Sequence, residues 1–113
     1  MDRPSQFACL MRELRNGTGS GQLGLLSVEV LLHVAEQPRT IEQLVQLTKA
    51  RNAHVNRAVL KLTPWYDKQA GQVRIPELHL LQRRRRAQAR GYRIHLTCKG
   101  RELLARVGFP HSM

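Results

Sequence analysis

Short polar side chains that can pair with the edges of nucleic-acid bases are concentrated between residues 49 and 61. An arginine guanidinium offers two donors that match a guanine, and an asparagine amide offers a donor and an acceptor that match an adenine. No acidic residue occurs between Glu42 and Asp67, so no carboxylate there would repel a phosphate backbone. The residues predicted to contact bases are Arg51, Asn52, His54, Asn56 and Arg57, and those predicted to contact phosphates are Lys49 and Lys61. The simpler alternatives are an ordinary surface residue for His54 and a helix cap for Asn52.

A second basic segment, RRRRAQARGYRIHLTCKG at residues 83–100, holds six arginines, one lysine and no acid. A run of like charges is usually a solvated surface or a tail. In this segment the apolar residues Tyr92, Ile94 and Leu96 follow at every second position, which is the period of a strand. We therefore expect one arm of a folded hairpin in place of a tail.

The arginines of this hairpin cannot all face the same way, because successive side chains of a strand point to opposite sides. Arg90, near the expected tip, is the candidate for insertion into a minor groove. The other arginines predicted to contact DNA are Arg83, Arg84, Arg85, Arg86 and Arg93. Those that face away from DNA would be solvated or paired with acids such as Glu77.

Charge is unevenly distributed along the chain. The 113 residues carry 19 Lys and Arg against 8 Asp and Glu, which gives a formal net charge of +11 and a pI near 11.3. Residues 1–48 hold four basic and five acidic residues, whereas residues 49–113 hold fifteen and three. Because such asymmetry is typical of a nucleic-acid-binding surface, we expect a polyanionic partner, with a generically basic protein as the alternative.

Several classes of protein do not fit the sequence. Cys9 and Cys98 are too far apart to match a zinc motif, and the histidines show no ligand spacing, so we expect no metal and no cofactor. We find no paired carboxylates, phosphate loop or nucleophile motif, and therefore expect no enzyme. The N-terminus lacks the apolar run of a leader, and no apolar run could span a bilayer, so a cytoplasmic location with free thiols is expected. A redox role for Cys98, at the start of a predicted helix, stays open.

The length fits one small domain, in which helices must position most of these side chains. Apolar spacing predicts a short helix over 5–15, followed by a flexible Gly-rich linker over 16–22. Three more helices are predicted from their caps. Ser27 is the expected N-cap of the first, Thr40 with Gln43 forms a capping box for the second, and Asn52 begins the third.

The remaining segment is expected to hold the basic hairpin and a closing helix. Residues 63–80 read either as a small hairpin turning at Ala70 and Gly71 or as an irregular loop in which Trp65 plugs the core edge, and we favour the loop or a partial hairpin. Strands are expected within 78–86 and 91–97. A last helix begins at Thr97 and ends at Gly108.

This order of elements, and two quotable segments, resemble the winged helix-turn-helix proteins and their MarR-type branch in particular. The segment LLSVEVLLHVAEQPRTIEQLVQLTKARNAHVNRAVLKL is similar to the helical part, and GYRIHLTCKGRELL to the wing strand that returns into an LTxxG helix start. The resemblance implies a mostly helical α+β fold: a three-helix core, a β-hairpin wing and a closing helix. It also implies a DNA-binding domain over 23–108, preceded by a helix and linker over 1–22 and followed by a tail over 109–113.

The resemblance further implies a sequence-specific regulator, most simply a repressor that binds a palindromic site in double-stranded DNA as a homodimer. The chain departs from the family in having Gln88 where an Asp is usual, in the lengthened 63–80 segment, and in ending at Met113 without the long C-terminal dimerisation helix. We therefore expect a minimal relative without a small-molecule effector. The alternative is an accessory or adaptor protein, of replication, partition or conjugation, in which 63–80 or the N-terminal helix docks a partner.

Overall fold

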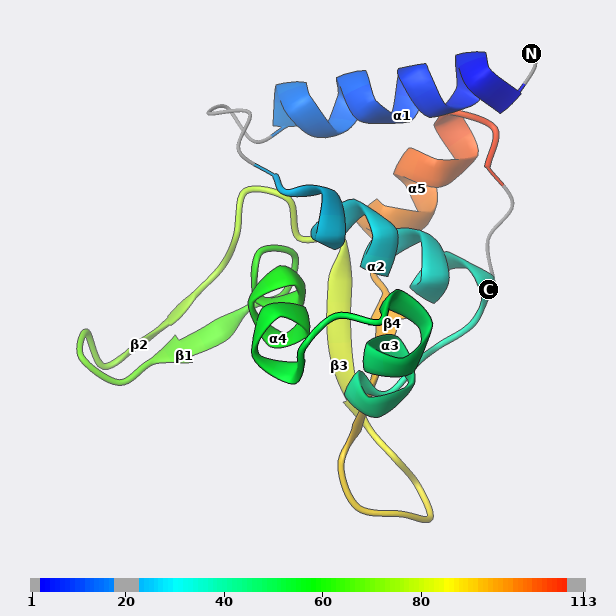
Figure 1. Ribbon diagram of the computed structural model, residues 1–113. Helices are drawn as coiled ribbons and strands as arrows, with labels where there is room; N and C mark the ends of the chain where they lie inside the picture. Colours follow the sequence, from blue (N-terminus) through cyan, green and yellow to red (C-terminus); the bar gives the residue numbers. More distant parts are fainter. Residues whose placement is uncertain (1–2, 18–22, 110–113) are drawn as a thin grey trace.

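The computed structural model describes residues 3–17 and 23–109 (Figure 1). In the described residues the elements are, in chain order, α1 (Arg3–Gly17), α2 (Leu25–Glu36), α3 (Ile41–Thr48), α4 (Asn52–Leu60), β1 (Trp65–Asp67), β2 (Gln72–Arg74), β3 (Leu81–Arg85), β4 (Tyr92–Leu96) and α5 (Cys98–Arg106). The predicted mostly helical α+β class is confirmed. The predicted linker falls largely on residues 18–22, outside the described residues, and Asn16 and Gly17 belong to α1.

The core is aliphatic and forms where α2, α3 and α4 pack together and β4 covers α2. Its largest fully buried side chains are Leu10, Leu14, Leu31, Leu44, Leu62, Leu80, Leu81, Ile94, Leu104, Val30, Val34 and Val55. Helix α1 lies across the top of the molecule and packs on α5 (Figure 1). Leu10 and Leu14 of α1 therefore lie in this chain's own core, whereas Phe7 is 44% exposed and stacks edge-on against Phe109.

Two of the predicted helix starts are confirmed. The Gln43 backbone N–H donates to Thr40 Oγ1 (3.1 Å), and the Thr40 N–H donates to Gln43 Oε1 (2.9 Å), which completes the capping box of α3. Thr97 caps α5 by accepting from the Gly100 N–H (3.0 Å). Satisfying these otherwise unpaired donors stabilises each helix end by about 1 kcal/mol.

The prediction for Ser27 is wrong. Helix α2 begins earlier, with Gly24 as its N-cap, so that Ser27 lies buried inside the first turn. Its hydroxyl donates to the backbone carbonyl of Ala58 in α4 (3.0 Å). The same hydroxyl that could have capped a helix instead satisfies a polar contact between two packed helices.

The segment after α4 forms a short hairpin, so the partial hairpin that we favoured beside the loop is confirmed, and a wholly irregular loop is wrong. Strand β1 pairs with β2 in the register Trp65–Arg74, Tyr66–Val73 and Asp67–Gln72. Asp67 Oδ1 accepts from the Gln69 and Ala70 N–H groups, and Gly71 takes a positive φ of 67°, as the tight turn requires. Trp65 does not plug the core: its side chain is 40% exposed.

Strands β3 and β4 form the second hairpin, which projects below the helices (Figure 1). Both strands are shorter than the predicted ranges, because β3 covers only Leu81–Arg85 and β4 only Tyr92–Leu96. Leu78 and Leu80 are buried, but they lie before β3. Arg39 fixes the base of the hairpin: its N–H donates to the Ile94 carbonyl (3.2 Å), and the Ile94 N–H donates to the Arg39 carbonyl (2.6 Å). The hairpin is thus attached to the α2–α3 connection.

Candidate nucleic-acid interface

The residues predicted to contact DNA from the helical region all lie at the surface around α4. All but Asn56 are exposed, and Asn56 is partly buried; the set is Lys49, Arg51, Asn52, His54, Asn56, Arg57 and Lys61. They are presented outward because Val55, Ala58 and Val59 of the same helix are buried in the core. The helix therefore offers one polar, cation-rich side to solvent.

The connection between α3 and α4 is tight. Lys49 ends α3 in the left-handed conformation (φ 59°, ψ 24°), and its N–H donates to the Val45 carbonyl (2.9 Å). Arg51 occupies the N-cap position of α4 without a side-chain hydrogen bond, so the predicted cap at Asn52 is wrong. Asn52 lies in the first turn, where its Oδ1 accepts from Asn56 Nδ2 (2.6 Å). The two amides form one hydrogen-bonded pair along the helix.

The hairpin arginines line both sides of the β3–β4 ladder. Arg86 is partly buried and the others are exposed: Arg83, Arg84, Arg85, Arg90 and Arg93. Arg83 is paired with Ile94 and Arg85 with Tyr92, on the side that continues into the core, whereas Arg84 is paired with Arg93 on the opposite side. Of the two alternatives predicted for arginines that face away from DNA, solvation or pairing with an acid such as Glu77, the pairing does not occur: none of these arginines forms an ion pair within residues 3–17 and 23–109.

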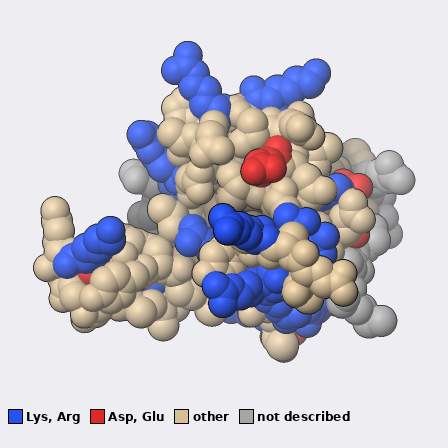
Figure 2. Space-filling view, turned by 90° about the horizontal axis from the view of Figure 1, so that it is seen from below, with Lys and Arg blue, Asp and Glu red and all other residues tan. Residues whose placement is uncertain are grey.

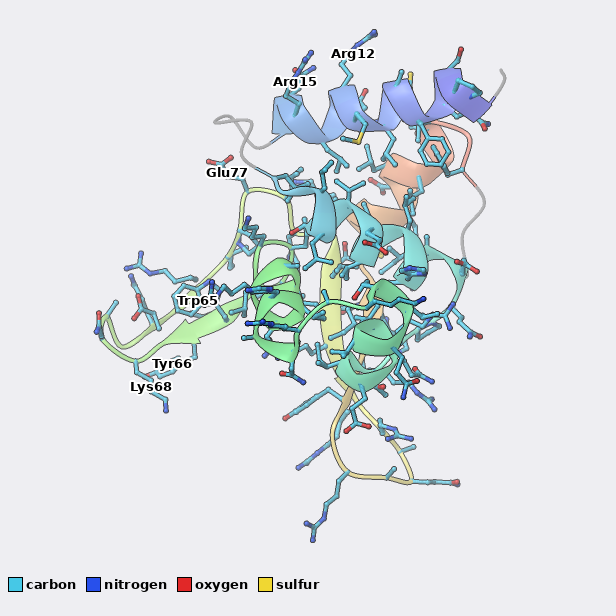
Figure 3. The ribbon with its side chains drawn as sticks, in the orientation of Figure 1. Arg12, Arg15, Trp65, Tyr66, Lys68 and Glu77 are labelled. Carbon is cyan, nitrogen blue, oxygen red and sulfur yellow. The ribbon has the colours of Figure 1, made fainter. Side chains whose placement is uncertain are left out.

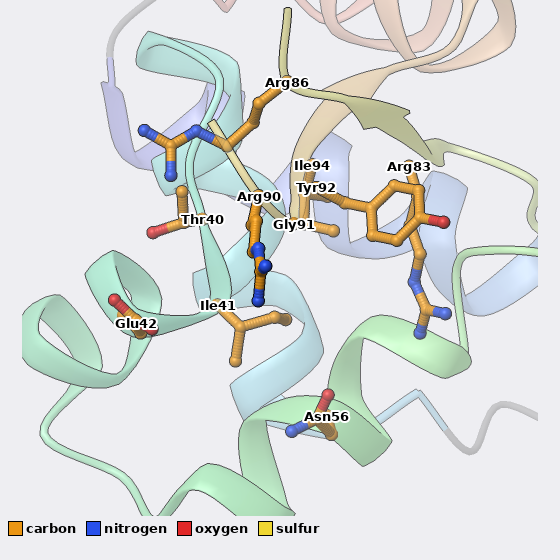
Figure 4. A pocket seen from close by; sticks show the side chains of 10 residues that line it. All are labelled: Thr40, Ile41, Glu42, Asn56, Arg83, Arg86, Arg90, Gly91, Tyr92 and Ile94. Carbon is orange, nitrogen blue, oxygen red and sulfur yellow. The ribbon is translucent and has the colours of Figure 1, made fainter. Parts of the chain in front are cut away.

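A cleft of about 330 Å³ separates the hairpin from α3 and α4. Figure 4 shows Arg83 and Arg90 pointing from the hairpin toward the helices, with Asn56 facing them from α4. The lining residues are Thr40, Ile41, Glu42, Asn56, Arg83, Arg86, Arg90, Gly91, Tyr92 and Ile94. Three arginines against one carboxylate make this cleft attractive to phosphate, and Asn56 places an amide beside them.

Six lining residues of the cleft were not predicted as site residues, and Tyr92 and Thr40 are the two that add polar groups beside Glu42. Tyr92 continues the apolar alternation of Ile94 and Leu96, but it lies beyond the core and is 54% exposed at the cleft. Thr40 was identified only as a cap, although the capped end of α3 also borders the cleft. The start of a helix carries partial positive charge, which adds to the attraction for an anion.

Cations gather on the side of the molecule that carries the hairpin tip. Figure 2 looks at this side from below and shows Lys and Arg side chains concentrated at its centre, with few acidic atoms among them. Such a field attracts a polyanion over several ångströms and accelerates its association. This long-range attraction adds to the short-range attraction of the hydrogen-bond donors on α4 and in the cleft.

Two titratable groups, His95 and Asp67, have pKa values that their surroundings lower. Burial, followed by the charges of Arg84, Arg93 and Arg101, lowers the pKa of His95 below its usual 6.5. The Ala70 N–H and the Arg74 side chain lower the pKa of Asp67, which is part of the β1–β2 turn. Within the described ranges no three His, Cys, Asp or Glu side chains are placed to share a metal ion, and both cysteines are free thiols.

Comparison with known proteins supports the fold. No protein-family model and no curated protein sequence matches the chain. Among solved structures, the transcriptional regulator BldR from Sulfolobus solfataricus is similar to it, with a TM-score of 0.55 and 21% sequence identity over 95% of this chain and 77% of that chain. The chain has the winged-helix fold.

In this fold α3 and α4 form the helix-turn-helix, of which α4 is the second helix, and the β3–β4 hairpin (81–96) is the wing. The β1–β2 hairpin lies between α4 and the wing in the sequence and projects to the side of α4 (Figure 1). None of the helices in the described ranges is both long and apolar enough to cross a membrane.

Proposed function

We propose that this protein is a transcriptional regulator that binds a specific sequence of double-stranded DNA. Helix α4 would be the recognition helix and enter the major groove, where Arg51, Asn52, His54, Asn56 and Arg57 reach base edges. Lys49, at the end of α3, and Lys61, at the end of α4, would contact phosphates. The wing would hold the adjacent minor groove and backbone.

The observation that carries this proposal is the cleft between the recognition helix and the wing. It places an asparagine that can read a base within the same 330 Å³ space as three arginines that can hold phosphates. A DNA-binding protein needs both kinds of contact at once, because phosphate contacts fix the register in which base contacts are made. A generically basic surface would not align the two.

The proposed number of subunits follows from the length of DNA sequence that must be recognised. We propose a MarR-like repressor that acts as a homodimer through its 23–108 domain, since one short recognition helix reads few base pairs. Two copies related by a two-fold axis would read a palindrome with half-sites about 10 base pairs apart. The transcriptional regulator BldR, whose solved structure is similar, favours a regulatory role over a purely architectural one.

Selection of bound duplexes from a random pool tests the proposal. We expect an enriched palindromic sequence, and a log–log salt dependence with a slope of several units, because each neutralised phosphate contributes about 0.9. Binding with the same affinity to every duplex would contradict a sequence-specific regulator. Light scattering of the free and DNA-bound protein measures the stoichiometry.

The exposed β1–β2 hairpin favours a second candidate function, that of an adaptor. Tyr66 (60%), Val73 (58%) and Ile75 (70%) are largely exposed, and a two-stranded hairpin with no covered face is marginally stable by itself. Tyr66 and Lys68 point to the side of the molecule on which the wing tip lies (Figure 3). Replacement of 65–74 by a short Gly-Ser turn decides between the two: a regulator keeps its DNA sequence preference, whereas an adaptor loses its partner.

A further inference from the structure

The wing has two faces with different surroundings. In the antiparallel ladder Arg83 is opposite Ile94, and this face continues through Leu81 and Leu96 into the core and borders the cleft. The other face is formed by Gln82 opposite His95 and Arg84 opposite Arg93. We call the latter set, together with Arg101 of α5, the outer wing face.

Arg101 belongs to this face because its charge acts on the same imidazole as those of the strand arginines. The pKa of His95 is lowered by burial first and then by Arg84, Arg93 and Arg101. Three cations, carried by β3, β4 and α5, therefore act on His95, and we call them the row. At the tip end of this row lies a hollow of about 360 Å³ lined by Arg86, Ala87, Gln88, Ala89 and Arg93.

The row is electrostatically unfavourable without an anion. Like charges directly opposite each other in a ladder destabilise the pair, as Arg84 and Arg93 do here. Neither of them, nor Arg101, forms an ion pair with a carboxylate of the described residues. The Nε of Arg101 is buried and donates no hydrogen bond within these residues. A buried donor without an acceptor is unfavourable.

We propose that the outer wing face binds phosphates of the duplex that flanks the segment held by the recognition helix and the cleft. The proposal rests on the proposed function and extends the footprint beyond the wing. Arg83, Arg86 and Arg90 line the cleft, so they would contact the phosphates of the DNA strand that lies in it. DNA that continues past the wing meets the outer face next, and bending it toward α5 would bring successive phosphates along the row.

Duplex DNA fits this face better than an acidic protein segment does. The row is almost entirely guanidinium and offers His95 as its one aromatic ring, without the exposed Tyr, Trp or Met that anchors protein interfaces. Arginine pairs with phosphate oxygens through two parallel hydrogen bonds, and repeated phosphates match repeated arginines.

Two adjacent residues on opposite faces give a matched test. The double variant R84A/R93A removes two cations from the outer face, whereas Arg83→Ala removes one from the cleft face. All three side chains are exposed, so the fold is retained. Binding is measured on two duplexes of the enriched sequence: a short one that ends at the wing, and a long one with about 10 additional base pairs, one helical turn, at each end.

We expect R84A/R93A to weaken binding to the long duplex about tenfold and to lower its salt slope by about 2, with little change on the short one. Arg83→Ala should weaken both. Equal effects of R84A/R93A on the two lengths, or no effect on either, would overturn the flanking contact. If the wild-type protein binds neither duplex, the proposed function itself fails.

His95 supplies a readout that is independent of affinity. Bound phosphates would offset the charges of Arg84, Arg93 and Arg101, so NMR titration should show the pKa of His95 rising toward its usual value on the long duplex and not on the short one. An unchanged titration on the long duplex would place the phosphates elsewhere and overturn the proposal.

Discussion

Gly100, at the start of α5, lies directly against the backbone of Leu80. A Cβ on Gly100 would stand 2.5 Å from the Leu80 carbonyl oxygen, closer than real Cβ contacts allow. This oxygen cannot simply move, because it accepts a hydrogen bond from the Thr97 N–H (2.9 Å). The close approach lets α5 begin directly after the wing, so the glycine of the LTxxG segment sets where the wing joins the domain.

Gly100→Ala is therefore expected to destabilise the protein by about 1–3 kcal/mol, the usual cost of inserting atoms into a packed site. The urea unfolding midpoint measures the change. Cys98→Ala is the control, since this exposed side chain belongs to the same helical turn. A Gly100→Ala protein as stable as the control would mean that α5 can shift without cost.

Local signals predicted the elements whose stabilising contacts lie close in sequence. Thr40 and Thr97 cap helices through partners three residues away, so a sequence pattern contains the whole interaction. The errors arise where a distant partner competes for the same group. Ser27 donates to Ala58, 31 residues away, and this contact is available only once α2 and α4 have packed.

The candidate site shows the same division. The composition of the arginine run and its period of two indicated a wing, but only the register shows that Arg83 and Arg84 serve different faces. Asn56 and Arg83 line the same cleft although they are 27 positions apart in the sequence. The turn of the β1–β2 hairpin was indicated in the sequence only by the weak signal of Gly71. Local periodicity contains none of these long-range relationships.

Lys49→Gly should increase stability and weaken DNA binding. Lys49 is the one non-glycine residue of the described ranges with positive φ, and relief of this backbone strain by glycine is worth about 1 kcal/mol. Loss of its charge should lower the salt slope by about 0.9. Lys49→Ala is the matched control, because it loses the same charge and keeps the strain. Equal stability of the two variants would argue against strain at this turn.

His95 should make the free protein less stable in mild acid. Its pKa is lowered in the folded state by burial and by the neighbouring arginines, so between that pKa and about 6.5 the unfolded chain binds more protons. Stability should therefore fall as the pH drops through about 6.5 and level off below the folded pKa. His95→Gln should flatten this part of the urea-midpoint profile. A His54→Gln control, on the exposed side of α4, should keep it.

Base contacts and phosphate contacts should respond differently to alanine. Asn56→Ala or Arg57→Ala removes a side chain that we propose reads bases, so the preference for the enriched sequence over competitor DNA should fall by about 1–3 kcal/mol at one position. Arg85→Ala removes a wing cation paired with Tyr92, and should weaken binding to all duplexes alike while lowering the salt slope by about 0.9. Competition binding at two salt concentrations separates these outcomes. If both classes of variant lowered specific and non-specific affinity by the same factor, the recognition helix would be a backbone contact and the reading of bases would have to lie elsewhere.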